Sequence, residues 1–286
     1  MTDSTIGRIA VLGAGVMGTG IATLAVGRGV PVVLVDVDQA TLGKATASIR
    51  QQTRLGRLMG AFDPAVGDGE LATTTHVTAI AGAAAVIESV TEKADLKAMV
   101  LTAATAVVTP GTVVVSNTSA IPIDELAEHC ARPEDVVGIH FMNPPYLIRT
   151  VELIRGPRSS DAAIAAAEAL LARLGQTPVH VGDGPGFVIN RVLQRSINEA
   201  ARIVQDGVAT PEAVDAAFTG CLGHRTGPLA TADLIGLDNV VDSLHVLLER
   251  TGDEGYRPCE LLVAKVKAGE FGRKTSRGFF EHEGAL

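Results

Sequence analysis

A glycine-rich turn near the start of the chain limits the possible folds more than any other feature. An apolar run at residues 8–12 leads directly into GAGVMG at residues 13–18, and a helical pattern follows at once. In such a turn the first glycine permits the tight bend, the second lets a phosphate approach the backbone, and the third lets helix and strand pack closely. We therefore expect a strand, a turn and a helix whose positive end binds the pyrophosphate of a dinucleotide.

A second apolar run, residues 31–36, ends in Asp36, eighteen residues after Gly18. An acid at this place accepts hydrogen bonds from both ribose hydroxyls and repels the additional 2′-phosphate of NADP. The next residue, Val37, offers no arginine to that phosphate. The pattern therefore predicts NAD as the cofactor. The predicted contacts in this part of the site are Gly13, Gly15, Val16, Met17, Gly18 and Asp36.

The first part of the chain alternates short β-branched runs with alanine-rich stretches of helical period, which is typical of βαβ units. Glycines and a proline gather at residues 182–186, and every later segment has a helical pattern. We therefore expect an α/β fold, with a Rossmann-type, mostly parallel sheet domain at 1–183 and an all-helical domain at 184–286 for substrate binding and dimerisation. The expected strands are 8–12, 31–36, 84–87, 112–115, 136–140, 150–155 and 177–181, and the expected helices include 16–28, 39–57, 93–107, 161–174, 187–206, 238–250 and 260–267.

Composition narrows the class of partner. The chain of 286 residues is 47% hydrophobic, enough for a sizeable core, and its formal net charge of -8 opposes nonspecific binding of nucleic acid. Three scattered cysteines without CxxC spacing fit neither a disulfide framework nor a zinc site, and the histidines form no metal motif. We expect a small-molecule partner and no metal.

Two further expectations concern location and assembly. The first residues show no secretory pattern, and no apolar run approaches the roughly 20 residues of a membrane span. We therefore expect a cytoplasmic protein that contacts no membrane. The helix expected at 187–206 carries more apolar surface than so small a bundle can bury alone, which predicts a homodimer.

His140 and Glu152 indicate the chemistry. They lie in VVGIHFMNPPYLIRTVEL at residues 136–153, where a short apolar strand ends in His140 and the NPP sequence forces a turn. A second apolar strand would then return Glu152 to the level of His140. Because imidazole titrates near neutrality and an adjacent carboxylate fixes its tautomer, the pair is predicted to be a general base. The alternative is a buried histidine that Glu152 merely satisfies.

Five motifs in this order resemble the 3-hydroxyacyl-CoA dehydrogenase family, which includes the bacterial 3-hydroxybutyryl-CoA enzymes. They are the glycine turn, IESVTEKADLK at 87–97, SNTSAIPI at 116–123, HFMNPP at 140–145 with the later glutamate, and DGPGFVINR at 183–191. The resemblance continues through TGPLATADLIGLD at 226–238 to GRKTSRGFF at 272–280, and so covers nearly the whole chain. It implies a two-domain dimer with its active site between the domains, and NAD-dependent interconversion of hydroxyl and carbonyl at C3 of an acyl thioester.

By that resemblance His140 is the catalytic base, Glu152 is its partner, and Ser119 and Asn190 bond the substrate oxygen and shape the site. Alcohol oxidation needs a hydride acceptor and removal of the hydroxyl proton, so one neutral histidine suffices without a metal. Ser119 follows a strand at the carboxyl edge of the sheet, where ligands bind, although a helix cap is an alternative. A buried Asn190 is costly unless its amide is bonded. The resemblance places Glu92, Lys97 and Asn143 near the ribose and nicotinamide of the cofactor, and Asn117 is predicted to join them.

The chain departs from the family pattern just before Glu152. The family usually reads PVMKLVE there, whereas this chain reads PYLIRTVE at 145–152. Tyr146 is bulky with a polar tip, and Arg149 offers a planar fork suited to a carboxylate or phosphate. We therefore expect both to contact a short or polar acyl group; a surface arginine in place of a surface lysine is the alternative.

A second departure lies at residues 58–62, where the family is commonly lysine-rich and this chain has Met59 and Ala61. Weaker contacts with the phosphates of CoA would suit an acyl group carried by an acyl carrier protein. The chain is similar in this respect to dehydrogenases of polyketide extender-unit clusters that act on carrier-bound glyceryl groups on the way to methoxymalonyl units. Arg54 and Arg57 could serve a CoA phosphate or an acidic carrier, although the net charge opposes fast capture of the latter. Both carriers stay open.

Two other functions compete. A β-hydroxyacid dehydrogenase acting on a free acid shares the domain arrangement but usually employs a lysine, and the His–Glu pair argues against it. A noncatalytic NAD-binding protein of the same fold is the second rival, because fold does not fix function. The four intact site residues argue against that interpretation.

Overall fold

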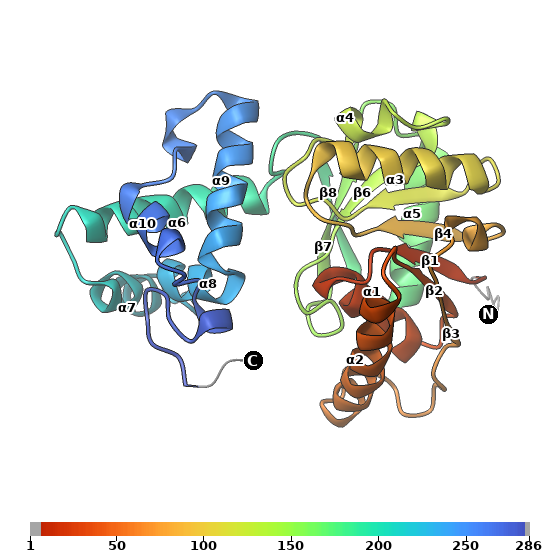
Figure 1. Cartoon of the computed structure of the whole chain (residues 1–286), viewed down its shortest axis with the longest axis horizontal. Helices are drawn as coiled ribbons and strands as arrows, with labels where there is room; N and C mark the ends of the chain where they lie inside the picture. The colour runs from red at the N-terminus through yellow and green to blue at the C-terminus, as the bar shows by residue number, and fades with distance from the viewer. Residues whose placement is uncertain (1–6, 284–286) are drawn as a thin grey trace. The chain divides into compact units, whose positions relative to one another are not determined.

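The computed structural model describes residues 7–283 and contains two compact units, which span Met1–Gly184 and Pro185–Leu286. Figure 1 shows a mixed α/β first unit and a second unit whose described residues form helices and no named strand. The predicted fold class, a Rossmann-type sheet domain followed by an all-helical domain, is confirmed. No described helix combines the length and the apolar character that crossing a membrane requires.

The first unit is built on one sheet of eight strands. These are β1 (Ile9–Leu12), β2 (Val32–Val35), β3 (Leu71–Thr74), β4 (Ala85–Glu88), β5 (Val113–Ser116), β6 (Val136–His140), β7 (Thr150–Arg155) and β8 (Thr177–Gly182). Their order is β3-β2-β1-β4-β5-β6-β7-β8, and all neighbours are parallel except β6 and β7. The chain order reverses between β1 and β4. In open α/β sheets such a reversal marks the place where a ligand binds, outside the carboxyl ends of the strands.

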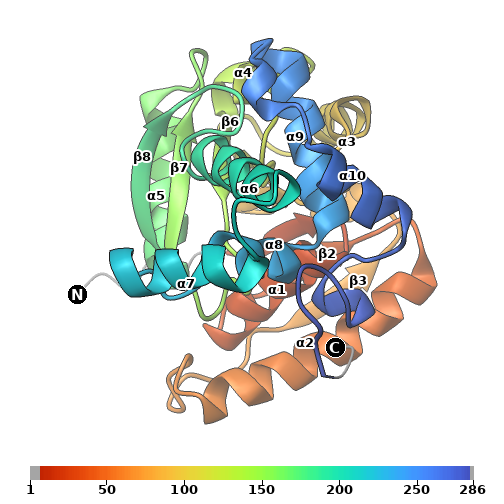
Figure 2. The same cartoon turned by 90° about the vertical axis from the view of Figure 1, so that its left-hand side faces the viewer.

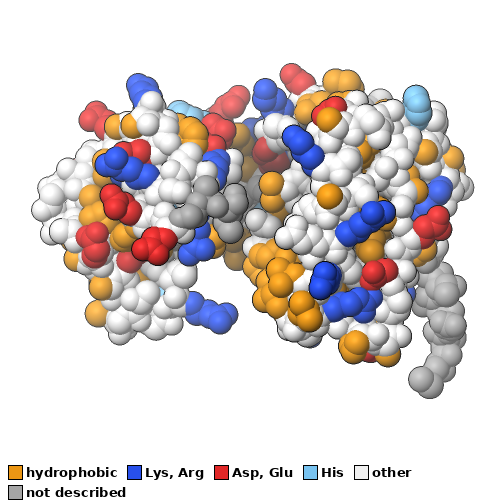
Figure 3. Space-filling model, turned by 60° about the horizontal axis from the view of Figure 1, so that its bottom comes forward, with side chains coloured by type: hydrophobic (Ala, Val, Ile, Leu, Met, Phe, Trp, Pro, Cys, Tyr) orange, Lys and Arg blue, Asp and Glu red, His pale blue; other side chains and the backbone are white. Residues whose placement is uncertain are grey.

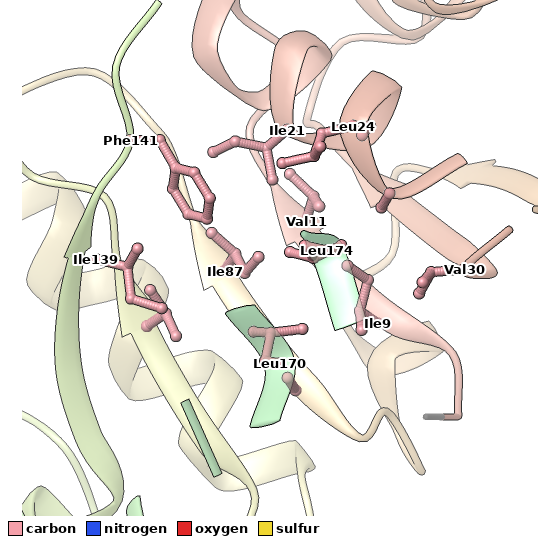
Figure 4. Close-up of a cluster of buried hydrophobic side chains, with 14 of the residues drawn as sticks. Ile9, Val11, Ile21, Leu24, Val30, Ile87, Ile139, Phe141, Leu170 and Leu174 are labelled. Atoms are coloured by element: carbon pink, nitrogen blue, oxygen red, sulfur yellow. The ribbon is translucent and has the colours of Figure 1, made fainter. Parts of the chain in front are cut away.

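Helices cover both faces of this sheet. They are α1 (Val16–Gly27), α2 (Gln39–Leu58), α3 (Ala94–Val107), α4 (Ile123–Ala127) and α5 (Asp161–Leu174), with 3₁₀ turns η1 (Val77–Ile80) and η2 (Pro133–Asp135). Strands β1, β2, β4 and β5 are buried along their whole length, which is why they are apolar except for the last residues of β4 and β5, Glu88 and Ser116. Side chains of α1, α2 and α5 share one core with the sheet, and α3 lies on the face opposite α5 (Figure 1). Figure 4 shows part of this core, including Ile9, Val11, Ile21, Leu24, Ile87, Ile139, Phe141, Leu170 and Leu174.

Strand β3 was not predicted from the sequence. It pairs with β2 in the register Val32↔Leu71 and forms an edge of the sheet. Its four residues, LATT, are at most half-buried, so they lack the apolar run by which the central strands were found. The structure therefore adds one strand to the predicted sheet, next to the strand that precedes Asp36.

The second unit is a bundle around α6. Its elements are α6 (Ile189–Gln205), α7 (Pro211–Leu222), α8 (Pro228–Ile235), α9 (Leu237–Thr251), α10 (Glu260–Lys267), and the 3₁₀ turns η3 (Glu254–Tyr256) and η4 (Arg273–Thr275). Figures 1 and 2 show α6 in the middle of this unit, where it packs on α7, α8, α9 and α10. The short helix α8 was not predicted, although Pro228 stands at its first position, where proline is favoured.

Candidate active site

The glycine turn has the geometry that dinucleotide binding requires. Gly13 has a φ of +97°, and a Cβ on it would lie 2.7 Å from the carbonyl oxygen of Ser89. A Cβ on Gly18 would lie 1.8 Å from the carbonyl oxygen of Gly13, so only glycine lets α1 pack this closely. A Cβ on Gly15 would meet nothing within 4 Å. The open space at Gly15 is where a pyrophosphate can approach the start of α1.

Asp36 is fixed beside this turn. One carboxylate oxygen, Oδ2, accepts a hydrogen bond from the Ala14 amide at 2.7 Å, and Oδ1 accepts one from the Asp38 amide at 3.1 Å. The hydroxyl of Ser89, at the end of β4 against Gly13, is buried and has no hydrogen-bond partner among the described residues. A phosphate or ribose oxygen would satisfy it, so the residues present fit a dinucleotide. At the mouth of this turn Val16 is exposed and Met17 half-buried.

His140 and Glu152 lie directly opposite each other in the antiparallel pair β6–β7. The distance from His140 Nδ1 to Glu152 Oε2 is 2.8 Å, and the residues are 6% and 4% exposed. Because a carboxylate only accepts hydrogen bonds, Nδ1 carries the proton and Nε2 is the basic nitrogen of the ring. The hairpin predicted from the sequence thus brings a histidine and a carboxylate together at the carboxyl end of β6.

Asn117 holds the backbone next to this pair. Its side-chain oxygen accepts a hydrogen bond from the backbone amide of Phe141 at 3.0 Å. The backbone amide of Asn117 donates to the backbone carbonyl of Glu88 at 2.9 Å. Asn117 therefore ties the end of β5 to the residue that follows His140. Asn143 is exposed three residues beyond His140 and is joined to Pro144 by a cis peptide bond.

Ser119 lies three residues after β5 and is half-buried. It does not occupy the N-cap position of α4, which is Pro122, and α4 has no side-chain cap hydrogen bond from that position. The first amides of α4, those of Ile123 and Asp124, donate instead to the carboxylate of Asp183 at 2.8 Å each. The helix-cap alternative for Ser119 is therefore not what the structure shows.

Glu92 and Lys97 lie next to the Ser119 turn. Lys97 is 1% exposed, and its Nζ is 3.2 Å from Glu92 Oε2. Burial by itself raises the pKa of Glu92. The Lys97 ammonium and hydrogen bonds from the turn lower it by more than burial raises it, so the pKa lies below its ordinary value. Glu92 is thus held in its charged form. Glu88, a fully buried acid at the end of β4, also bonds Lys97. It was not predicted from the sequence, although an acid that ends an otherwise apolar strand is a signal of a buried, partnered carboxylate.

Tyr146 and Arg149 have different surroundings in the structure. Tyr146 is a core residue whose ring centroid is 6.1 Å from that of Phe62, and Pro145 before it packs against Gly20 of α1. Arg149 is exposed near Arg28; burial first, and then the charge of Arg149, lower the pKa of Arg28. The loop after His140 thus folds over α1 because two prolines and Tyr146 bury their apolar surface there.

Arg54 and Arg57 lie on the C-terminal half of α2. Arg54 is exposed, whereas Arg57 bonds the carboxylate of Asp68 and the carbonyls of Asp63 and Val66. Arg57 therefore fastens the arm at residues 63–70 to α2. Figure 3 shows hydrophobic side chains gathered beside Lys and Arg side chains on this face of the first unit. The large apolar side chains exposed at the end of α2 are Leu55, Leu58 and Met59.

Asn190 belongs to the second unit. It lies in the first turn of α6 and is 9% exposed. Gln194 and Asn198 follow at spacings of four residues and are also buried, so one side of α6 carries a row of buried amides. Asn198 bonds the carbonyls of Gly255 and Arg257 and the amide of Cys259.

The sheet and the glycine turn together define a dinucleotide-binding protein of the Rossmann type. Models of the 3-hydroxyacyl-CoA dehydrogenase NAD binding domain and C-terminal domain match residues 8–184 and 186–282. The chain therefore belongs to the 3-hydroxyacyl-CoA dehydrogenase family, and its cofactor is NAD.

Three relatives illustrate the similarity. A 3-hydroxybutyryl-CoA dehydrogenase of Bradyrhizobium diazoefficiens is 40% identical over 99% of this chain and 97% of its own length. The structure of (S)-3-hydroxybutyryl-CoA dehydrogenase from Ralstonia eutropha has a TM-score of 0.88 at 36% identity, covering 98% of this chain and 100% of that one. The structure of FadB2 from Mycobacterium tuberculosis has a TM-score of 0.91 at 33% identity, with the same coverage.

Proposed function

We propose that this enzyme interconverts the hydroxyl and carbonyl groups at C3 of a short 3-hydroxyacyl-CoA, with His140 as the general base. The observation that carries the proposal is the buried His140–Glu152 pair at 2.8 Å, beside the carboxyl ends of parallel strands. The substrates named for the relatives support the acyl class, since those proteins are 3-hydroxybutyryl-CoA dehydrogenases.

In the oxidation direction, Nε2 of His140 accepts the proton of the substrate hydroxyl. Glu152 keeps the proton of Nδ1 in place and stabilises the imidazolium that forms, which is the ordinary work of such a carboxylate. Ser119 donates a hydrogen bond to the reacting oxygen, and Asn190 of the second unit shapes the site. NAD, when bound, supplies the hydride acceptor. In the reverse direction His140 returns the proton to the new hydroxyl.

The cofactor contacts follow from the same proposal. The amides of Gly15, Val16 and Met17 at the start of α1 face the pyrophosphate, and Asp36 accepts hydrogen bonds from the adenosine ribose. Glu92, Lys97, Asn117 and Asn143 border the nicotinamide end. Asn117 acts there through the Phe141 amide that it holds.

A second candidate substrate is an acyl group on a carrier protein, such as the glyceryl group of a methoxymalonyl extender unit. The helix α2 favours it, because its sequence QATLGKATASIRQQTRLGRL contains one lysine, three arginines and no acid. Exposed apolar side chains at its end, those of Leu58 and Met59, adjoin these cations. Such a surface suits an acidic amphipathic helix as well as the phosphates of CoA.

One assay separates these candidates. Consumption of NADH is measured with acetoacetyl-CoA, and formation of NADH from NAD is measured with a carrier-bound 3-hydroxyacyl or glyceryl thioester and with a free 3-hydroxy acid. Efficient turnover of acetoacetyl-CoA supports the main proposal and removes the reason for a carrier. Turnover of the carrier-bound thioester alone supports the second candidate. Equal turnover of the free acid favours a β-hydroxyacid dehydrogenase, and no turnover of any of them favours a noncatalytic NAD-binding protein.

We also propose that the enzyme is a cytoplasmic homodimer that associates through its helical domain. A groove along α6, lined by Val192, Ile203, Phe218 and Tyr256 among others, supports an interface there. Val192 and Leu222 are 66% and 64% exposed and belong to the apolar surface that a second copy would cover. Sedimentation of a strict monomer at micromolar concentration would contradict the dimer.

A further inference from the structure

The turn that carries Ser119 is folded around one carboxylate oxygen of Glu92. This oxygen, Oε1, accepts hydrogen bonds from the Thr118 hydroxyl at 2.6 Å, the Ser119 amide at 2.8 Å and the Ala120 amide at 3.0 Å. Successive amides that point at one anion form a nest that binds it, and bonds to a charged acceptor are stronger than neutral ones. The Thr118 hydroxyl also accepts from the Ile121 amide at 3.0 Å, which closes the turn.

Glu92 is itself fixed from the other side. Its second oxygen, Oε2, lies 3.2 Å from Lys97 Nζ. That ammonium also donates hydrogen bonds to Glu88 Oε1 at 2.8 Å and to the Val90 carbonyl at 3.1 Å, so it is held between two carboxylates.

Glu88 completes the arrangement and is 0% exposed. Its Oε2 accepts from the Ser116 hydroxyl at 2.6 Å, and its Oε1 also accepts from the Val90 amide at 2.7 Å. A continuous series of charge-assisted bonds therefore runs from the end of β4, through α3, to the backbone of Ser119. Buried polar groups that are fully satisfied in this way make a local structure rigid.

We propose that Glu92 is a positioning residue for Ser119: its carboxylate, backed by Lys97 and Glu88, is the template on which the turn from Thr118 to Ala120 is folded. The inference rests on the proposed function, in which Ser119 bonds the reacting oxygen. It assigns to Glu92 a role beyond contact with the cofactor. Loss of the carboxylate releases the turn, and Ser119 then no longer meets the substrate in a fixed place.

The isosteric variant Glu92→Gln tests this role because an amide cannot replace the carboxylate on both sides. Glu92 accepts the hydrogen bonds of the turn on one oxygen and faces the Lys97 ammonium with the other, whereas glutamine has one accepting oxygen and one donating nitrogen. Whichever way the amide is oriented, a donor faces either the turn's donors or an ammonium. Glu128→Gln is the matched control, since Glu128 is an exposed glutamate at the end of α4.

Two measurements are made on the full-length enzyme. Hydrogen exchange without cofactor reports on the Ser119 and Ala120 amides, and kcat is measured at saturating NADH and acetoacetyl-CoA in Glu92→Gln, Ser119→Ala and the double variant. We expect both amides to exchange at least about tenfold faster in Glu92→Gln, and kcat to fall at least about tenfold. In the Ser119→Ala background the Glu92→Gln change should cost little further kcat, because residues that act through each other are not additive.

The outcomes are distinct. Unchanged exchange at the two amides, or a change confined to KM for NADH, overturns the positioning role and leaves Glu92 as a cofactor contact. An equal loss of kcat with and without Ser119 also overturns it. Full kcat in Ser119→Ala overturns the proposed role of Ser119 alone, while faster exchange in Glu92→Gln would still support the template. If Glu92→Gln does not fold, Thr118→Val removes one donor from the same oxygen and should also speed exchange of both amides.

Discussion

Glu152 and Glu88 are both buried acids on paired strands of one sheet, but their partners differ. Glu152 lies opposite His140 on β6, whereas Glu88 lies opposite Ser116 on β5 and bonds the Lys97 ammonium. An imidazole gains and loses a proton near neutral pH, while an ammonium held between two acids keeps its proton. A buried glutamate can therefore assist proton transfer where its partner is an imidazole, and hold a backbone in place where its partner is an ammonium. The partner decides between the two.

The largest effect is expected at the proton-transferring pair. His140→Ala removes the proposed base, and general bases contribute about 10² to 10⁴ in rate, so we expect kcat to fall about 10³-fold. Binding of NADH, followed by its fluorescence, should stay within about twofold of the wild type, since the proposed contacts with the pyrophosphate come from the glycine turn. His180→Ala is the control, because His180 forms an exposed pair with Glu168. If turnover survives in His140→Ala, His140 is not the base.

A substitution in the buried cluster of Glu88, Lys97 and Glu92 should lower the free energy of unfolding. Lys97→Met leaves the fully buried Glu88 without its counter-charge, and breaking a buried pair in this way typically costs about 3–5 kcal/mol. We expect a matching loss in urea unfolding followed by far-ultraviolet circular dichroism, because the chain has no tryptophan. Lys44→Met, an exposed change on α2, should alter stability little. An unchanged midpoint for Lys97→Met would show that Glu88 is not held as a charge.

Glu152→Gln sharpens the comparison because it keeps the shape of the pair and removes its charge. The imidazolium loses its stabilising carboxylate, so we expect kcat to fall about 10²-fold with KM for NAD unchanged. Glu168→Gln is the matched control, since it makes the same change in the exposed pair with His180 at 3.0 Å. Equal kcat in Glu152→Gln and the wild type would reduce Glu152 to a packing residue.

The two acids also differ in how far the sequence could predict them. The apolar strands on either side of the NPP turn specify a hairpin, and period-two alternation then places Glu152 level with His140, as the register shows. The partners of Glu88 are Lys97 and Ser116, which come from α3 and β5, so the local sequence shows a buried acid but not what it bonds. Tyr146 was expected at the substrate because of its polar tip. The local sequence does not show that its ring packs near Phe62, or that Pro145 before it packs against Gly20 of α1. The glycine turn and the order of β-branched runs were enough for the fold class, whereas the half-exposed β3 was missed because it has no apolar run.

The smallest expected effect is the change of stability at acidic pH that Glu92 causes. Glu92 belongs to the buried cluster with Lys97 and Glu88. The pKa of Glu92 is depressed below its usual 4.5, despite burial, by Lys97 and by hydrogen bonds from the turn. A depressed carboxyl stabilises the folded state above the unfolded pKa, and this contribution is lost as the pH falls through the folded pKa. The difference in Tm between wild type and Glu92→Gln should therefore be constant from about pH 6 to 5 and shrink below about pH 4.5. Glu128→Gln should follow the wild type throughout. A Tm difference that grows on acidification would mean that Glu92 is held protonated, and a neutral acid could not accept the three bonds of the Ser119 turn while facing Lys97.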